Sequence, residues 1–253
     1  MMAPMLMLDA DTVPTPAQLE AAAAPGPGTV IAGWIDWGAN SGWLRQDPTA
    51  FARVLERGHS LLPMVCPLQP VVGVPWGFGP PEAADAWDRI IASVPGPLDP
   101  ASRTAMIDIE AGSFAAGRGG ALAAIAAFCD TGRARGWSPV LYGDAATCEA
   151  SAALPAAWRP DRIWIAWWSA PSGLVGAQPA DCWGVPGLRD PLYSGPDQRA
   201  RQWAGNIRGR LGWSVDLSIT TFTGCRRPWA TPAPLGGSET PSDPSSTGDP
   251  PCR

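Results

Sequence analysis

The sequence predicts an α/β fold of the (β/α)8 type, a closed barrel in which one or two late helices are missing. Short apolar runs alternate along the chain with Ala-rich segments of helical period. About eight such units follow one another, which suits a barrel whose parallel strands are each covered by a helix. An open doubly wound sheet is the alternative, although no GxGxxG or P-loop pattern supports a nucleotide site.

The expected elements follow from the periodicity and from the residues that end each run. Pro16 suits the first turn of the first helix, Asp47 and Pro48 open the second, and Gly58 closes it. Strands are expected at 5–9, 29–36, 60–67, 104–110, 138–144, 162–169, 201–205 and 214–222. Helices are expected at 14–24, 47–58 and 80–94, within 118–135, and near 146–157.

One domain is expected, because residues 1–228 carry all of these elements. Residues 229–253 are rich in Pro, Ser, Gly and Thr and predict a disordered tail. The N-terminal run lacks a basic region, so no signal peptide is expected, and no apolar stretch suits a membrane span.

The amino-acid composition disfavours several classes of function. The net charge is −5 and only 16% of residues are charged, which disfavours a nucleic-acid binder. The chain has 14 Trp against 2 Tyr and 5 Phe, which suits a groove that stacks on sugar rings as well as ordinary packing. With a single histidine, His59, expected at the surface, a Ser/His/Asp or Cys/His catalytic set is disfavoured.

The six cysteines do not have the spacing of a zinc site, so no structural metal is expected. One or two disulfides remain possible, and Cys66 and Cys129 lie in apolar segments that indicate buried thiols.

Acidic residues stand at the ends of several expected strands. Asp108 and Glu110 in TAMIDIE share one strand face, and near the carboxyl end of a barrel strand they would point into the site. Asp9 (with Asp11 beyond it), Asp36 and Asp216 accompany three other strands. Crowded carboxylates raise one another's pKa. Glycoside hydrolysis requires a protonated acid beside an ionised carboxylate. Two alternatives remain: acids that only shape turns, and a divalent metal held by the residues Asp9, Asp108, Glu110 and Asp216.

The order of motifs resembles the family 25 glycoside hydrolases, the lysozymes of the Chalaropsis type. It resembles more closely their relatives, the glycoside-hydrolase-like domain of unknown function of actinobacterial and phage proteins. The matching motifs, between about residues 5 and 225, are LDAD, IDIE, VLYGD, WIAWW, QWAGN and SVDLS. The lysozymes usually open with G-x-D-V-S, where this chain has LDADTVPTPAQ, and AGWIDWGANSGW suits the relatives better.

The resemblance implies a role for each matching residue and no cofactor. Glu110 would be the general acid, Asp108 and Asp216 would orient the substrate N-acetyl group or assist water, and Asp9 would complete the cluster. The remaining substrate-binding residues would be Asp36 and Gln202, with Tyr142, Trp164, Trp168 and Trp203 as stacking surfaces. Family 25 enzymes cut the β-1,4 bond between N-acetylmuramic acid and N-acetylglucosamine. A protein nucleophile, an activated water and the substrate's own acetamido group remain open as the second participant.

The expected partner is cell-wall polysaccharide, without nucleic acid or membrane. A wall-cleaving domain without a signal peptide suits a phage of an actinobacterial host, either as an endolysin released from the host cytoplasm or as a virion tail component bound to other tail proteins. Two other functions remain open: a non-catalytic glycan-binding or adhesion module of a phage tail, and a structural barrel.

Overall fold

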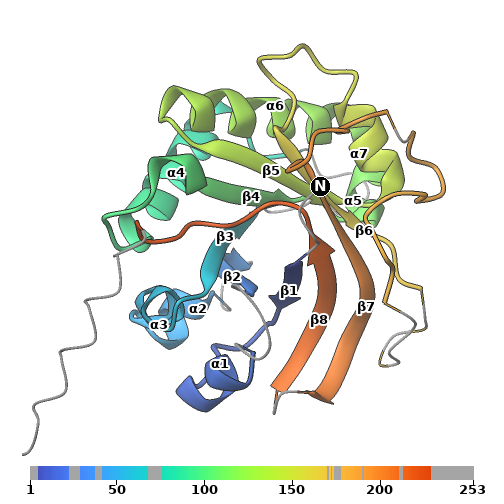
Figure 1. The fold of residues 1–253 in the computed structure, drawn as a ribbon. Coiled ribbons are helices and arrows are strands. Elements are labelled where there is room, and N and C mark those ends of the chain that lie inside the picture. Colours follow the sequence, from blue (N-terminus) through green and yellow to red (C-terminus); the bar gives the residue numbers. More distant parts are fainter. Residues whose placement is uncertain are drawn as a thin grey trace, which may run out of the picture.

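The computed structural model describes residues 5–22, 29–37, 42–67, 76–169, 171, 173, 178–189, 191–210 and 213–228, without the side chains of 36, 37 and 208–210. Eight strands close into a barrel in chain order, which confirms the α/β barrel (Figure 1). The strands are β1 (Met5–Asp9), β2 (Val30–Trp37), β3 (Ser60–Cys66), β4 (Thr104–Asp108), β5 (Ser138–Gly143), β6 (Arg162–Ala166), β7 (Arg199–Arg210) and β8 (Trp213–Thr220).

The last strand runs against the others. Neighbours from β1 to β7 are parallel, whereas β8 is antiparallel to both β7 and β1. The barrel is therefore mixed, where sequence alternation predicted parallel strands. Since β8 runs backwards, its early residues lie beside the carboxyl ends of the other strands, and Asp216 pairs with Asp9.

Helices follow each of the first five strands. They are α1 (Pro16–Ala22), α2 (Trp43–Gln46), α3 (Ala50–Glu56), α4 (Pro80–Ser93), α5 (Ala111–Ala116), α6 (Arg118–Ala134) and α7 (Ala145–Ser151), with a 3₁₀ turn at Pro100–Ser102. The helix predicted at 47–58 is shorter in the structure, because α3 begins only after Thr49 and ends at Glu56. The short helix α2 precedes this segment and was not predicted. Among the described residues no helix lies between β6 and β7, and β7 pairs antiparallel with the next strand, β8 (Figure 1).

A buried arginine contacts several described residues of the connection between β6 and β7. Arg199, at the start of β7, has no exposed surface. Its Nε donates to the carbonyl of Leu192 at 3.0 Å, its Nη2 donates to the carbonyl of Arg189 at 3.0 Å, and its guanidinium lies 4.1 Å from the Trp183 ring centre. One cation thereby holds Trp183, Arg189 and Leu192 against the start of β7, because a guanidinium has five N–H donors that can bind several carbonyls.

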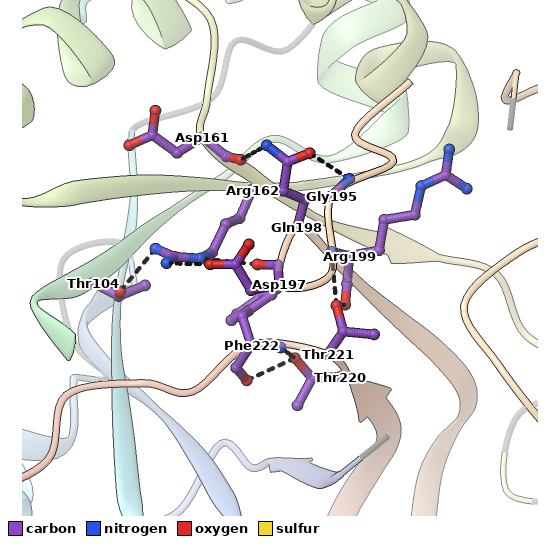
Figure 2. A network of polar contacts seen from close by, with 10 residues as sticks. All are labelled: Thr104, Asp161, Arg162, Gly195, Asp197, Gln198, Arg199, Thr220, Thr221 and Phe222. Atoms are coloured by element: carbon purple, nitrogen blue, oxygen red, sulfur yellow. Dashed lines mark hydrogen bonds and ion pairs between the residues drawn. The ribbon is translucent and has the colours of Figure 1, made fainter. Parts of the chain in front are cut away.

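Paired polar groups fill the amino-terminal end of the barrel (Figure 2). Arg162 Nη1 donates to Thr104 Oγ1 at 3.2 Å, Arg162 Nη2 is 3.1 Å from Asp197 Oδ2, and the guanidinium lies over the Phe222 ring. A cavity of about 400 Å³ lies at this end, lined among others by Arg159, Tyr193 and Gln198. None of the strand-end acids borders it, so they belong to the opposite, carboxyl end.

Two expectations about single residues need correction. His59 is 3% exposed, not a surface residue, and its Nε2 lies 2.9 Å from the Leu19 carbonyl, which joins the start of β3 to α1. Cysteines 66, 129, 148, 182 and 225 form no disulfide with one another. Cys129 is buried as expected, but Cys66 is partly exposed.

Other expectations fall on residues that are not described. Cys252 and the predicted tail at 229–253 lie outside the described residues. Within the described part of the chain, no helix has both the length and the apolar character needed to cross a membrane.

Glycine at position 132 is required by the packing of α6 on α4. The Trp87 ring stacks on Phe128 with centroids 4.6 Å apart, and its Nε1 donates to the Phe128 carbonyl at 2.8 Å. A Cβ at Gly132 would lie 2.2 Å from Trp87 Cζ2. We expect Gly132→Ala to lower the free energy of unfolding by about 1–3 kcal/mol, measured by urea denaturation.

Gly119→Ala is the matched control, because it lies in the same helix and its Cβ would meet nothing within 4 Å. It should be neutral or stabilising by up to about 1 kcal/mol. Equal stabilities of the two variants would contradict the packing argument.

Candidate active site

Two aspartates face each other across the antiparallel closure of the barrel. Asp9 ends β1 and is in direct register with Asp216 of β8. Directly paired residues share a sheet face, with Cβ atoms about 4.5–5.5 Å apart. The chain just after Asp9 is held by buried Trp43, whose Nε1 donates to the Ala10 carbonyl at 2.9 Å. The two carboxyl groups therefore lie close together at the carboxyl end of the barrel.

The Asp108–Glu110 pair lies at the carboxyl end of β4. β4 ends at Asp108, two residues earlier than predicted, and Glu110 is the N-cap residue of α5. Ile109 N donates to the Tyr142 carbonyl at 3.0 Å, so the chain stays extended along β5 beyond the strand end. Asp108 is 1% exposed whereas Glu110 is exposed. The pair thus reaches from the barrel interior to its surface.

Tyr142 lies among all four acids. It is the register partner of Asp108 on β5, and its ring packs edge-on against Trp164 with centroids 5.0 Å apart. Burial raises its pKa first, and the charges of Asp108, Glu110, Asp9 and Asp216 raise it further. The phenol therefore stays neutral and can donate a proton in a hydrogen bond.

Gln202 joins Tyr142 to the Asp9–Asp216 pair. This fully buried side chain on β7 accepts at Oε1 from Tyr142 Oη at 2.9 Å and from Trp168 Nε1 at 2.7 Å. Its Nε2 donates to Asp216 Oδ2 at 2.8 Å. The backbone N–H of Asn206 donates to Asp216 Oδ1 at 2.5 Å. One amide thus connects β5, the end of β6, β7 and β8.

Burial is the main cause of raised pKa values in this cluster. It raises the pKa of Asp9 and of Asp108 well above the usual range, helped by Asp216 for Asp9 and by Glu110 for Asp108. Burial and then the charge of Asp144 raise the pKa of Glu110. Burial also raises the pKa of Asp216, to about 6, against the opposing hydrogen bonds from Asn206 and Gln202. Carboxyl groups that keep protons toward neutral pH are typical of acid–base sites.

The tryptophans divide into core and surface. Trp164 and Trp203 are 0% and 2% exposed, so neither offers a face to a sugar, which corrects their expected stacking role. Trp164 instead donates from Nε1 to Ser218 Oγ at 3.0 Å inside the barrel. Trp168 and its neighbour Trp167 are 39% and 37% exposed. The side chain of Asp36 lies outside the described residues.

Gly205 allows Trp168 to lie flat against β7. A Cβ at this glycine would be 2.2 Å from Trp168 Cζ2. The chain after β6 also continues along β7, because Trp167 N donates to the Gln202 carbonyl at 3.2 Å and Ser169 N to the Trp203 carbonyl at 2.8 Å. The indole is therefore fixed beside the acids and keeps part of its surface open.

Three contributors to the site were not predicted. Asp144 raises the pKa of Glu110 and caps α7 by accepting from Thr147 N at 2.8 Å. The motif VLYGD ends on Asp144 and could have indicated it. The motif QWAGN likewise ends on Gly205 and Asn206 and could have indicated them. In the described ranges, no group of three or more His, Cys, Asp or Glu is placed to hold a metal ion.

Comparison with known proteins supports the fold. No family model and no curated protein sequence matches the chain. A crystal structure of an uncharacterised B. stearothermophilus protein is similar with a TM-score of 0.56 and 19% identity, covering 85% of this chain and 95% of that one. The catalytic domain of the endolysin ply40 from a bacteriophage of Listeria monocytogenes is similar with a TM-score of 0.52 and 13% identity, covering 87% and 93%. At identities this low, the similarity supports the barrel fold alone.

The raised pKa of Asp216 predicts a pH-dependent stability. Between an unfolded pKa near 3.8 and a folded pKa of about 6, the folded state binds more protons than the unfolded state. The free energy of unfolding should therefore fall as pH rises through this window, by about 3 kcal/mol from this group alone. Urea denaturation at pH 4 to 7 measures the slope, and Asp216→Asn should flatten it.

Asp85→Asn is the control, since the Asp85 side chain is 71% exposed on α4. It should keep the wild-type slope. A slope that Asp216→Asn leaves unchanged would show that burial of this carboxyl does not limit stability.

Proposed function

We propose that this protein is a glycoside hydrolase that cleaves bacterial cell-wall glycan. The observation that carries the proposal is the convergence of Asp9, Asp108, Glu110 and Asp216 around Tyr142 at the carboxyl end of a barrel. In barrel enzymes this end holds the active site. Carboxyl groups with different environments, one able to hold a proton and another ionised, match the needs of glycosidic bond cleavage.

Exposure and charge suggest how the work is divided. Glu110 is the one of these four acids that is exposed, and its raised pKa suits a general acid that protonates the leaving oxygen. Asp108 is too deeply buried for that task and would support Glu110 from below. Asp216, with a pKa of about 6, is largely ionised at neutral pH and could orient a substrate N–H group.

The finer assignment is a muramidase of the family 25 kind, acting on peptidoglycan as a phage lysin or a virion-associated tail protein. The motif order supports it, and so does the shared barrel of the endolysin catalytic domain. Assay of the protein in purified particles would separate the two settings, because a tail component is present there and an endolysin is not.

A non-catalytic glycan-binding module is the second candidate, and the exposed aromatic pair of Trp167 and Trp168 favours it. Partly exposed indoles suit the apolar faces of sugars whether or not a bond is cut. The two functions differ in their need for Glu110, because only hydrolysis requires a proton donor at the glycosidic oxygen.

Glu110→Gln tests hydrolysis. Purified actinobacterial cell walls are incubated with each protein, and the released reducing ends are measured. The wild type should release reducing ends, and the variant should do so about 10²–10⁴-fold more slowly, since it cannot donate the proton. Glu56→Gln, an acid on α3 with a 58% exposed side chain, should match the wild type. Wall binding without release by any of the proteins would favour the binding module.

Trp168→Ala tests the aromatic surface, with Trp158→Ala as its matched control. The two residues are similarly exposed, at 39% and 47%, but Trp158 precedes β6 at the other end of the barrel. Loss of the Trp168 face should weaken cell-wall binding about 3- to 10-fold in a sedimentation assay, as expected for one aromatic contact. Equal weakening by both variants would place the glycan elsewhere.

A further inference from the structure

The paired carboxyl groups of Asp9 and Asp216 differ in their hydrogen-bond environment. Both oxygens of Asp216 accept from N–H donors, Oδ1 from Asn206 N at 2.5 Å and Oδ2 from Gln202 Nε2 at 2.8 Å. Oδ1 of Asp9 is buried and accepts from no hydrogen-bond donor. Hydrogen bonds from N–H groups stabilise the ionised form of a carboxyl group, and burial without them favours the neutral form.

The Gln202 amide cannot reverse its orientation at low cost. An indole N–H is a donor and never an acceptor, so the atom that faces Trp168 must be the amide oxygen. The same oxygen accepts the Tyr142 hydroxyl. The NH₂ group is consequently turned to Asp216, where only an acceptor oxygen satisfies it. The exposed indole thus determines which amide atom meets a buried carboxyl group on another strand.

The surrounding charges oppose ionisation of both members. Asp11 acts on both carboxyl groups, Asp108 acts on Asp9, and Glu110 acts on Asp216. The indole of Trp34 favours the ionised form of Asp9, but burial outweighs it. Since two negative charges directly opposite each other are unfavourable, a pair of this kind favours the state that holds one proton.

We propose that Gln202 is a positioning residue that assigns this shared proton to Asp9 and keeps Asp216 ionised. This inference rests on the proposed function for its purpose. An Asp216 that is ionised at neutral pH can accept a hydrogen bond from a substrate amide, such as an acetamido N–H, while neutral Asp9 avoids a second negative charge beside it. Gln202 would act through Asp216 without touching the reacting bond.

Carbon-13 NMR of protein labelled at the aspartate carboxyl carbons tests the proposal directly. Asp9→Asn and Asp216→Asn assign the two resonances by their disappearance. In the wild type at pH 7 we expect the Asp216 carbon to report an ionised group and the Asp9 carbon a protonated one. In Asp216→Asn the pKa of Asp9 should fall by about one unit or more, because the like charge is gone. A protonated Asp216 beside an ionised Asp9 would overturn the proposal.

Gln202→Met tests the role of the amide. It removes the donor at similar size, so the pKa of Asp216 should rise by about one unit. Gln198→Met makes the same change at the amino-terminal end, where Gln198 Nε2 donates to the Asp161 carbonyl at 3.3 Å, and should leave Asp216 unchanged. Equal titration of Asp216 in the wild type and Gln202→Met would exclude a role for the amide. If Gln202→Met does not fold, the wild-type titration still decides the proton's location.

The titration and the cell-wall assay can fail independently. If Asp216 is ionised beside protonated Asp9 but no reducing ends are released, the hydrolase function is contradicted and the proton assignment stands. Release of reducing ends by a protein whose Asp216 is the protonated member would do the reverse.

Discussion

The site depends on the reversal of β8, which closes the barrel against β1. A parallel last strand would bring its carboxyl end to the acids, and the early residues of β8 would lie at the far end. Because β8 is antiparallel, Asp216 stands directly opposite Asp9. The same reversal makes β7 and β8 a hairpin, so the strand that carries Gln202 lies beside the strand that carries Asp216. The strand arrangement that closes the barrel therefore also brings the residues of the candidate site together.

As a consequence, the acids proposed to act in the site lower the stability of the folded protein when they are ionised. Burial raises the pKa of Asp9, Asp108 and Asp216, so ionising them in the folded protein costs free energy. The rest of the fold offsets this cost with a barrel filled by large side chains, such as Trp164 within it and Trp87 between the helices. At the opposite end, polar groups such as Arg162 and Asp197 are paired. The carboxyl groups that burial disfavours therefore gather at the carboxyl end of the barrel, where the proposed chemistry would use them.

The tryptophan content has a structural explanation for most of the side chains described. Trp43 holds the chain after Asp9, Trp87 joins α4 to α6, and Trp164 fills the barrel beneath Tyr142. Trp168 combines both uses, because one face lies against the backbone at Gly205 and part of its surface stays open. Its N–H also orients Gln202, so a residue suited to bind sugar is connected to the buried carboxyl pair.

The sequence by itself determined the order of strands and helices and the acids near strand ends, because each follows from local periodicity and from the residues that end a run. It could not determine that β8 is reversed, since an apolar strand reads the same in both directions. It also could not separate Trp164 and Trp203 from Trp168, because burial depends on neighbours distant in the chain. The partners of Gln202 come from β5, β8 and the segment after β6. Only the closed barrel brings these groups within hydrogen-bond distance. The hydrogen bonds that result, and not the residue types alone, determine which carboxyl group can hold a proton.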